Sequence, residues 1–399
     1  MGAHARRVST AAAVACAIAP FTAPGAGADD AWTVQWNHGL QVTSADKAFS
    51  LKVGGRIQGD FTFVSEDPAL TADVLGDGFE FRRARLFLEG TVYERIEFKA
   101  EYDFATGDPV FNDVWIGING LGPGLLQVGH MKEPFSLEVL TNANFLPFVE
   151  RALPIEAFAP FRNSGIGYRG GNDFLSYGAG AYYDSDDFGL TSDEESTNLT
   201  GRLAVRPLYE EGGARLLHVG VSASFQERGA AGLRYRTRPE AHFSGRLVDT
   251  GVFPADGATV LGGEAAGVFG PFWFTGEYVA TDTDAPAAGD PSFDGAFVAA
   301  GWYLTGEHRK YRPAAGIFDR QKPKVNLGAE GSGAWEIAAR WSTIDLTDAG
   351  VAGGEQDNYT LALNWYLNPA TRMMLDWVHA DVDQVGEADF VVMRVQVDF

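Results

Sequence analysis

Apolar and polar side chains alternate along the segment Phe49–Val64, which reads FSLKVGGRIQGDFTFV. Its odd positions are apolar or glycine, and its even positions carry the polar side chains Lys52, Arg56, Gln58, Asp60 and Thr62. Because a β-strand sends successive side chains to opposite faces, this segment is predicted to be a strand with one apolar and one polar face. The segments Arg83–Val92 and Ile96–Phe104 repeat the same alternation.

These segments are long enough to cross a membrane. Each has about the 9–11 residues that a tilted transmembrane strand needs, and the polar faces carry charges of both signs, strand after strand. A sheet in hydrocarbon must close on itself, since an open edge would leave backbone groups without hydrogen bonds. The pattern therefore predicts an all-β fold: a transmembrane antiparallel β-barrel with lipid outside and a charged, water-filled lumen inside.

About sixteen strands are expected, because bacterial barrels have even strand numbers, short periplasmic turns and long external loops. They are predicted near Phe49–Val64, Phe79–Tyr93, Ile96–Phe104, Val110–Ile118, Leu125–Met131, Gly165–Arg169, Phe174–Tyr183, Asn198–Arg206, Arg215–Gln226, Thr259–Val268, Phe272–Thr281, Phe293–Leu304, Ala334–Ile344, Asn358–Leu367, Thr371–Asp381 and Asp389–Phe399.

Three segments interrupt this pattern. Lys132–Ser164 contains four prolines and five phenylalanines. Proline excludes it from a central strand and the aromatic content argues against disorder, so it is predicted to be a constriction loop folded into the barrel. Leu233–Val248 alternates like a strand but would make the strand count odd, so it is placed in an external loop, with a protruding ribbon as one possible form. Thr305–Gly333 is predicted to be a long, basic periplasmic connection.

The composition bounds the partners of the chain. Its 399 residues carry 31 Lys and Arg against 53 Asp and Glu, a formal net charge of −22. No nucleic acid is expected as a partner, since nucleic acid requires a basic face. Residues 1–28 are predicted to be a secretory signal peptide, with Arg6 and Arg7 before an apolar run. The single cysteine, Cys16, lies in that run; a lipoprotein anchor at Cys16 and a twin-arginine signal are weaker alternatives.

Residues 29–48 are expected to form a periplasmic N-terminal lead-in, and residues 49–399 the barrel domain. The chain ends on an alternating strand whose last residue is Phe399. This end resembles the C-terminal strand by which outer-membrane proteins are recognised for insertion. The barrel-assembly machinery is therefore an expected partner.

Several ordered motifs resemble the phosphate-selective porin O and P family. They are FSLKVGGRIQGDF at 49–61, FEFRRARLFLEG at 79–90, FKAEYDF at 98–104, LQVGHMKEPFSLE at 126–138, VERAL at 149–153, YLTGEHRKY at 303–311, GAWEIAARW at 333–341, LNWYLNP at 363–369 and VMRVQVDF at 392–399. The resemblance implies a sixteen-stranded trimeric porin whose third external loop constricts the lumen. It also accounts for the long basic connection as a family feature.

The resemblance suggests a set of pore-lining arginines. Arg56, Arg82 and Arg83 match arginines of the two ribbon motifs, and Arg151 matches one in the constriction loop. Arg85 shares the polar face of the second ribbon. Adjacent Arg82 and Arg83 can both face the lumen only if the strand is bulged or has already left the membrane. The lysine and serines that the resemblance implies after Glu138 are not matched, since residues 139–143 read VLTNA.

Each basic group also has a structural interpretation. The arginines would bind anion oxygens in bidentate pairs, or would pair with lumen carboxylates such as Asp60, Glu89, Glu97 and Glu101. The six Lys and Arg of Arg309–Lys324 would form an anion funnel at the periplasmic mouth or a solvated face.

The sequence therefore predicts a bacterial outer-membrane porin, a homotrimer in contact with lipid and lipopolysaccharide. It would pass small anions by passive diffusion, with phosphate or a polyphosphate-like anion favoured. A general or weakly cation-preferring porin is the main alternative, and an outer-membrane lipase or a structural or adhesive barrel is a weaker one. No hydrolase, metal-binding or phosphate-loop motif is present, so no enzyme activity, cofactor or metal is expected.

Overall fold

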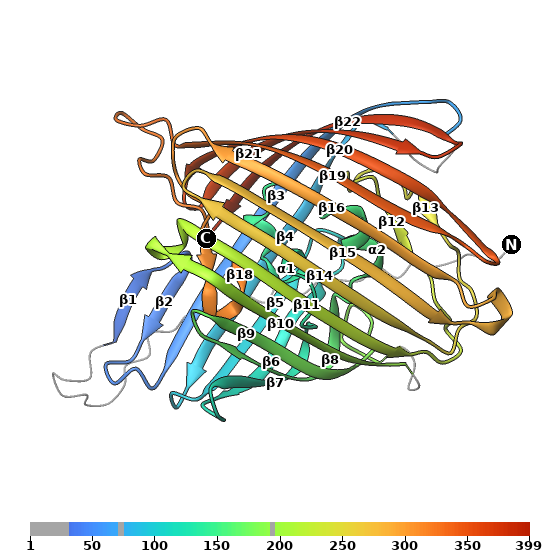
Figure 1. The fold of residues 1–399 in the computed structure, drawn as a ribbon. Coiled ribbons are helices and arrows are strands. Elements are labelled where there is room, and N and C mark those ends of the chain that lie inside the picture. Colours follow the sequence, from blue (N-terminus) through green and yellow to red (C-terminus); the bar gives the residue numbers. More distant parts are fainter. Residues whose placement is uncertain (1–31, 71–75, 192–195) are drawn as a thin grey trace, which may run out of the picture.

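Sixteen antiparallel strands form a closed barrel in the computed structural model, which describes residues 32–399 apart from 71–75 and 192–195 (Figure 1). Each strand pairs with its neighbours in the chain, and β22 pairs with β3 to close the ring. The barrel strands are β3 (Ser50–Glu66), β4 (Gly78–Val92), β5 (Ile96–Asp103), β6 (Val110–Asn119), β7 (Gly124–Lys132), β8 (Arg162–Gly171), β9 (Leu175–Tyr183), β10 (Thr197–Glu210), β11 (Arg215–Glu227), β14 (Gly257–Phe269), β15 (Phe272–Asp284), β16 (Ser292–Tyr303), β19 (Ala334–Asp348), β20 (Val351–Asn368), β21 (Thr371–Val382) and β22 (Gly386–Asp398). The predicted barrel and its strand number are confirmed. The predicted signal peptide lies outside the described residues.

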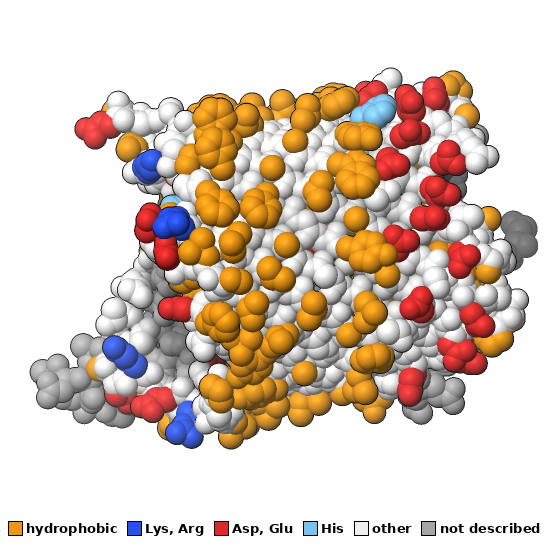
Figure 2. Space-filling model, in the orientation of Figure 1, with side chains coloured by type: hydrophobic (Ala, Val, Ile, Leu, Met, Phe, Trp, Pro, Cys, Tyr) orange, Lys and Arg blue, Asp and Glu red, His pale blue; other side chains and the backbone are white. Residues whose placement is uncertain are grey.

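The barrel wall has the two faces that the alternation predicted. On β22, Val391, Val395 and Val397 are exposed outward, whereas Arg394 and Asp398 are buried toward the lumen. Figure 2 shows the outward apolar side chains as a broad band across the visible face of the barrel, with acidic side chains gathered at one end. The apolar band matches the lipid-facing belt of an outer-membrane barrel.

The pairing of β22 with β3, which closes the barrel, extends to the last residue of the chain. The backbone of Phe399 exchanges two hydrogen bonds with Gly55, at 2.9 and 2.5 Å. Below this point β3 pairs instead with an N-terminal hairpin, β1 (Thr33–Trp36) and β2 (Leu40–Thr43). The predicted lead-in is therefore partly a strand extension of the barrel sheet.

The constriction loop (residues 133–161) folds into the lumen, as predicted. It contains α1 (Leu137–Leu140), η1 (Ala143–Phe145) and α2 (Leu153–Phe158). Within the described ranges, no helix is long and apolar enough to cross a membrane. The remaining short helices are η2 (Glu211–Gly213), η3 (Pro286–Ala288) and η4 (Pro313–Ala315).

The segment Leu233–Val248 is not a barrel strand, which confirms its placement in an external loop. The protruding form is wrong, because this lid loop (residues 228–256) turns inward. Tyr235 and Val248 are buried. Within the loop β12 (Arg236–Thr237) pairs with β13 (Val248–Asp249), and Leu233 forms a further bridge with Phe253. Its apolar side chains pack on those of the constriction loop, as in the edge-to-face contact of Tyr235 with Phe158. Burying this apolar face inside the barrel is more favourable than exposing it to water.

The two loops and the strands β11 and β14–β22 share one hydrophobic core inside the barrel. The periplasmic segment (residues 304–333) adds β17 (Tyr311–Arg312) and β18 (Ile317–Phe318), and Tyr311 and Phe318 join that core. One side of the lumen is thus filled with packed side chains, and the open space lies along β3–β10.

We expect the substitution Glu240→Ala to loosen the lid loop. Glu240 accepts hydrogen bonds from Arg340, Ser342 (2.5 Å) and Thr360 (2.8 Å), and the Arg340 and Glu240 side chains are fully buried. Removing one partner of a buried ion pair costs about 3–5 kcal/mol, because the other charge stays buried and unpaired.

Thermal unfolding of the detergent-solubilised barrel, followed by tryptophan fluorescence, measures this loss of stability. Asp249→Ala is the matched control in the same loop, since its pair with Arg234 is exposed to solvent and should contribute little to stability. Equal effects of the two substitutions would contradict the anchoring role of Glu240.

Candidate functional site: a basic chamber in the lumen

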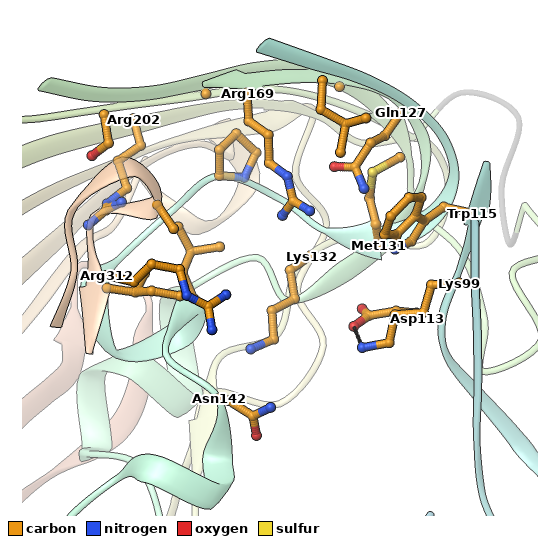
Figure 3. Close-up of a pocket in the computed structure, with 18 of the residues that line it drawn as sticks. Lys99, Asp113, Trp115, Gln127, Met131, Lys132, Asn142, Arg169, Arg202 and Arg312 are labelled. Carbon is orange, nitrogen blue, oxygen red and sulfur yellow. Dashed lines mark hydrogen bonds and ion pairs between the residues drawn. The ribbon is translucent and has the colours of Figure 1, made fainter. Parts of the chain in front are cut away.

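The open part of the lumen contains a chamber of about 750 Å³, between the wall of β3–β10, the constriction loop and the periplasmic segment (Figure 3). Three acidic side chains line it, Glu89, Asp113 and Asp319, against ten basic ones. The basic lining residues are Arg56, Arg83, Arg85, Lys99, Lys132, Arg151, Arg162, Arg169, Arg202 and Arg312. We call this space the basic chamber.

Arg56 and Arg85 lie directly opposite each other on β3 and β4. Like charges in this position repel, so the pair needs counter-ions. Glu101 on β5 supplies one, at 3.1 Å from Arg56 and 3.2 Å from Arg85, and Asp103 lies 2.6 Å from Arg85. The chamber wall therefore contains the carboxylate pairs that the structural interpretation of these arginines required.

Arg82 and Arg83 both face inward because β4 is bulged at this point. The register with β3 shifts between Gln58, which pairs with Arg83, and Gly59, which pairs with Phe81, so that Arg82 is the extra residue. Of the two alternatives, a bulge or a strand that has left the membrane, the structure shows the bulge. Arg82 does not line the chamber. Its guanidinium donates two hydrogen bonds to the carboxylate of Glu150 in the constriction loop, at 2.7 and 3.0 Å.

Glu150 is the shared counter-ion of three arginines. It lies 3.9 Å from Arg83 and 2.8 Å from Arg394 as well as contacting Arg82. Burial on its own raises the pKa of Glu150, but the three guanidinium groups hold that pKa well below its ordinary value. Glu150 is therefore ionised and ties the constriction loop to the wall while offsetting part of the arginine charge.

Arg151 points into the chamber from the constriction loop. It donates only to backbone carbonyls, those of Glu138 (3.3 Å), Val139 (3.3 Å) and Thr141 (3.4 Å). Burial lowers the pKa of Arg151, and the nearby Arg162 lowers it further. An arginine nevertheless stays charged, because its ordinary pKa lies far above neutral pH.

The sequence-based site missed five of the ten basic lining residues. Lys99, Arg169 and Arg202 stand on the lumen face of β5, β8 and β10, so the alternation alone would have indicated them. Lys132 and Arg162 flank the constriction loop, where the alternating pattern stops and does not indicate which side chains face the lumen. The missed set is Lys99, Lys132, Arg162, Arg169 and Arg202.

Three chamber cations have no carboxylate partner among the residues that the structure describes. Lys132 donates to the carbonyl oxygens of Val139 and Thr141, and Arg151 is similarly bound. Arg169 lies over the ring of Trp115, with its guanidinium carbon 5.9 Å from the ring centroid. Figure 3 shows Lys132 projecting into the middle of the chamber, and Arg169 enters the chamber from the neighbouring strand β8. These groups leave the chamber with a local excess of positive charge.

The periplasmic segment contributes one basic side chain to the chamber. Arg312 lines it and pairs with Asp319 at 3.0 Å. Arg309 is buried between the rings of Trp273 and Phe318, at 4.2 and 3.5 Å, and Arg320 pairs with Asp398. Of the six basic residues predicted as a funnel, five therefore do not line the chamber, and the funnel stays a prediction.

The segment nevertheless helps to shape the chamber floor. The carbonyl oxygen of Gly316 accepts a hydrogen bond from Arg202 at 2.8 Å. A side chain at 316 would collide with Ser176, since an added Cβ would lie 2.1 Å from its Oγ. The tip of the segment thus lies flush against β9 and β10. In the described part of the chain, no group of three or more His, Cys, Asp or Glu side chains is placed to hold a metal ion.

The chain resembles known porins in sequence and in fold. Residues 51–399 match the family described as phosphate-selective porin O and P. Porin O of Pseudomonas aeruginosa is 27% identical over 90% of this chain and 91% of its own, and an uncharacterised protein of Caulobacter vibrioides is 32% identical over 97% and 82%. The anion-selective porin of Comamonas acidovorans shares the fold, with a TM-score of 0.55 at 15% identity, over 88% of this chain and all of its own. The chain belongs to the phosphate-selective porin O and P family.

Proposed function

We propose that this outer-membrane porin is an anion-selective channel that passes small anions, phosphate among them, by passive diffusion. The observation that carries the proposal is the lining of the basic chamber, with ten basic and three acidic side chains. A water-filled passage with one sign of charge and low-dielectric walls concentrates ions of the opposite sign. The negative charge of the whole protein does not oppose this, because the field at the narrow part sets selectivity.

Some of the acidic side chains lie outside the lumen, where they affect the passage little. Figure 2 shows them on the outer surface at one end of the barrel. Asp282, Asp284 and Glu355 are examples, each exposed on a barrel strand. In contrast, the lid loop carries Arg238 and Arg246 near the constriction loop, and Arg238 pairs with Glu156 at 3.3 Å. Burial lowers the pKa of Arg246, and repulsion from Arg238 lowers it further, as expected where cations crowd together.

Lys132 and Arg151 are the cations best suited to bind a passing anion. A cation that donates only to backbone carbonyls can turn donors toward an anion without breaking an ion pair. An anion that enters the chamber loses part of its hydration shell, and charged donors replace those water contacts. Arg56 and Arg85 would act more weakly, because Glu101 and Asp103 already accept their hydrogen bonds.

Two further expectations concern assembly. A homotrimer, and recognition of the C-terminal strand by the barrel-assembly machinery, stay predictions. The apolar outer band supports contact with lipid, lipopolysaccharide or neighbouring subunits (Figure 2). The end of β22 supports recognition by the barrel-assembly machinery, since Phe399 completes the strand that closes the barrel.

The reversal potential in a KCl gradient across a planar bilayer tests the proposal. The wild-type channel should prefer chloride to potassium, and phosphate should reduce the chloride current. Lys132→Gln and Arg151→Gln should each lower the anion preference by about threefold to fivefold, since one charge interaction of about 1 kcal/mol is removed. Arg312→Gln, whose side chain is already paired, is the control and should change it less than twofold. Preference for potassium in the wild type would reject anion selectivity.

Glu150→Gln should have the opposite effect. The substitution keeps the size of the side chain but removes the carboxylate shared by Arg82, Arg83 and Arg394, so the constriction gains one net positive charge. We expect the anion preference in the same KCl gradient to rise about twofold to fivefold.

Two controls separate charge from loop position. Glu150→Asp keeps the charge and should stay close to wild type, and Glu210→Gln removes an exposed pair with Arg215 outside the chamber. Because the pKa of Glu150 is held well below its ordinary value, its carboxylate stays charged as the pH falls through the ordinary glutamate range of about 4. The difference between wild type and Glu150→Gln should therefore persist at pH 5. A fall in anion preference would show that Glu150 does not offset the arginines.

A further inference from the structure

We propose that the basic chamber binds organic phosphates with a polar ring, of the sugar phosphate class, more tightly than it binds inorganic phosphate. This inference rests on the proposed anion selectivity and adds the class of solute. Its basis is a pair of uncharged side chains, Trp115 and Gln127, that line the same chamber as the cations without a carboxylate partner (Figure 3).

The chamber is larger than a phosphate ion needs. Its volume of about 750 Å³ lies in the range of 300–1,000 Å³ typical of sites for small organic ligands. At Gly167, which lines the chamber, an added Cβ would lie 2.6 Å from the hydroxyl of Tyr182, so a larger residue there would displace Tyr182 from the chamber wall. The chamber therefore has room for a solute body larger than phosphate.

Trp115 offers an apolar surface close to charged side chains of the chamber. It lies on β6, two residues after Asp113, and is half-buried in the wall. β7 passes close beneath it because residue 129 is a glycine. There φ is +138°, and an added Cβ would lie 2.7 Å from the Cα of Trp115. With Arg169 over its ring, the indole is held in place as a platform on which a ring can pack.

Gln127 supplies an unsatisfied polar group next to this platform. It is 97% buried, lines the chamber, and its amide nitrogen has no hydrogen-bond partner among the described residues. Buried polar groups are nearly always hydrogen-bonded. A half-turn of the amide exchanges its oxygen and nitrogen, so either end can meet a hydroxyl group of a solute.

Together these groups match the parts of a sugar phosphate. The phosphate would lie among Lys132, Arg151 and Arg169, the ring would pack on Trp115, and a hydroxyl would bond to Gln127. An inorganic phosphate would use only the cations. The two solutes should therefore differ in their dependence on Trp115 and Gln127 but not in their dependence on Lys132.

Block of the chloride current through single channels in planar bilayers tests this inference, with inorganic phosphate, glucose 6-phosphate and glucose as probes. In the wild type, glucose 6-phosphate should reach half-block at a concentration about fivefold lower than phosphate, and glucose should not block. Trp115→Ala should raise the half-blocking concentration of glucose 6-phosphate about fivefold to tenfold, and that of phosphate less than twofold. Gln127→Leu should raise the half-blocking concentration of glucose 6-phosphate about threefold to fivefold and leave that of phosphate unchanged.

Three further variants complete the design. Trp115→Phe should retain most of the glucose 6-phosphate block, because a ring remains. Trp341→Ala is the matched control, since Trp341 is exposed on β19 outside the lumen. Lys132→Gln should weaken the block by both anions. Equal block by the two anions in the wild type, or equal weakening of both by Trp115→Ala, would overturn the inference and reduce Trp115 to a support for Arg169. A potassium-selective wild type that neither anion blocks would instead reject the proposed function itself.

Discussion

The structure depends on one constraint: a backbone that crosses hydrocarbon must satisfy its hydrogen bonds within its own sheet. Closure of β22 on β3 meets this requirement, and the two hydrogen bonds between Phe399 and Gly55 complete it. Once the sheet is closed, every strand must send alternate side chains into a small lumen. Charged groups that cannot face lipid are concentrated there, and their mutual compensation decides which of them remain available to a solute.

The lumen has two parts, a packed apolar side and an open charged side. Along β11 and β14–β22 the two inward loops fill it with apolar side chains, and buried pairs such as Arg340 with Glu240 anchor them. Along β3–β10 the basic residues outnumber the acidic ones and the space stays open. The same residues that exclude water from one side thus confine the passage to the charged side. Constriction-loop residues serve both parts, since Val149 packs in the core while Glu150 and Arg151 face the arginines.

Alternation was sufficient to predict the barrel, because it is a local pattern repeated many times. The strand number also required the rule that bacterial barrels have even numbers of strands, and the inward constriction loop was predicted from its prolines and phenylalanines. The position of the lid loop was not predictable in this way. Its residues alternate as a strand would, and only the apolar surface of the constriction loop, distant in sequence, explains why they turn inward. The positions of the predicted arginines agree with the chamber lining in part, and their role in binding an anion stays a prediction. Four of the predicted arginines line the chamber: Arg56, Arg83, Arg85 and Arg151. The pairing of Arg82 with Glu150 was not predictable, because it depends on a β-bulge and on a loop that is distant in sequence.

Lys132 explains how the chain can depart from its family motif and keep a basic constriction. The resemblance implies a lysine soon after Glu138, where residues 139–143 of this sequence read VLTNA. In the structure the ammonium group of Lys132, from the end of β7, donates to the carbonyl oxygen of Val139. A positive charge therefore stands beside the expected position, although it comes from a different element. Selectivity follows where charges lie in the lumen rather than their order in the chain, so a missing motif residue is weak evidence against an anion channel when a neighbouring strand supplies the charge.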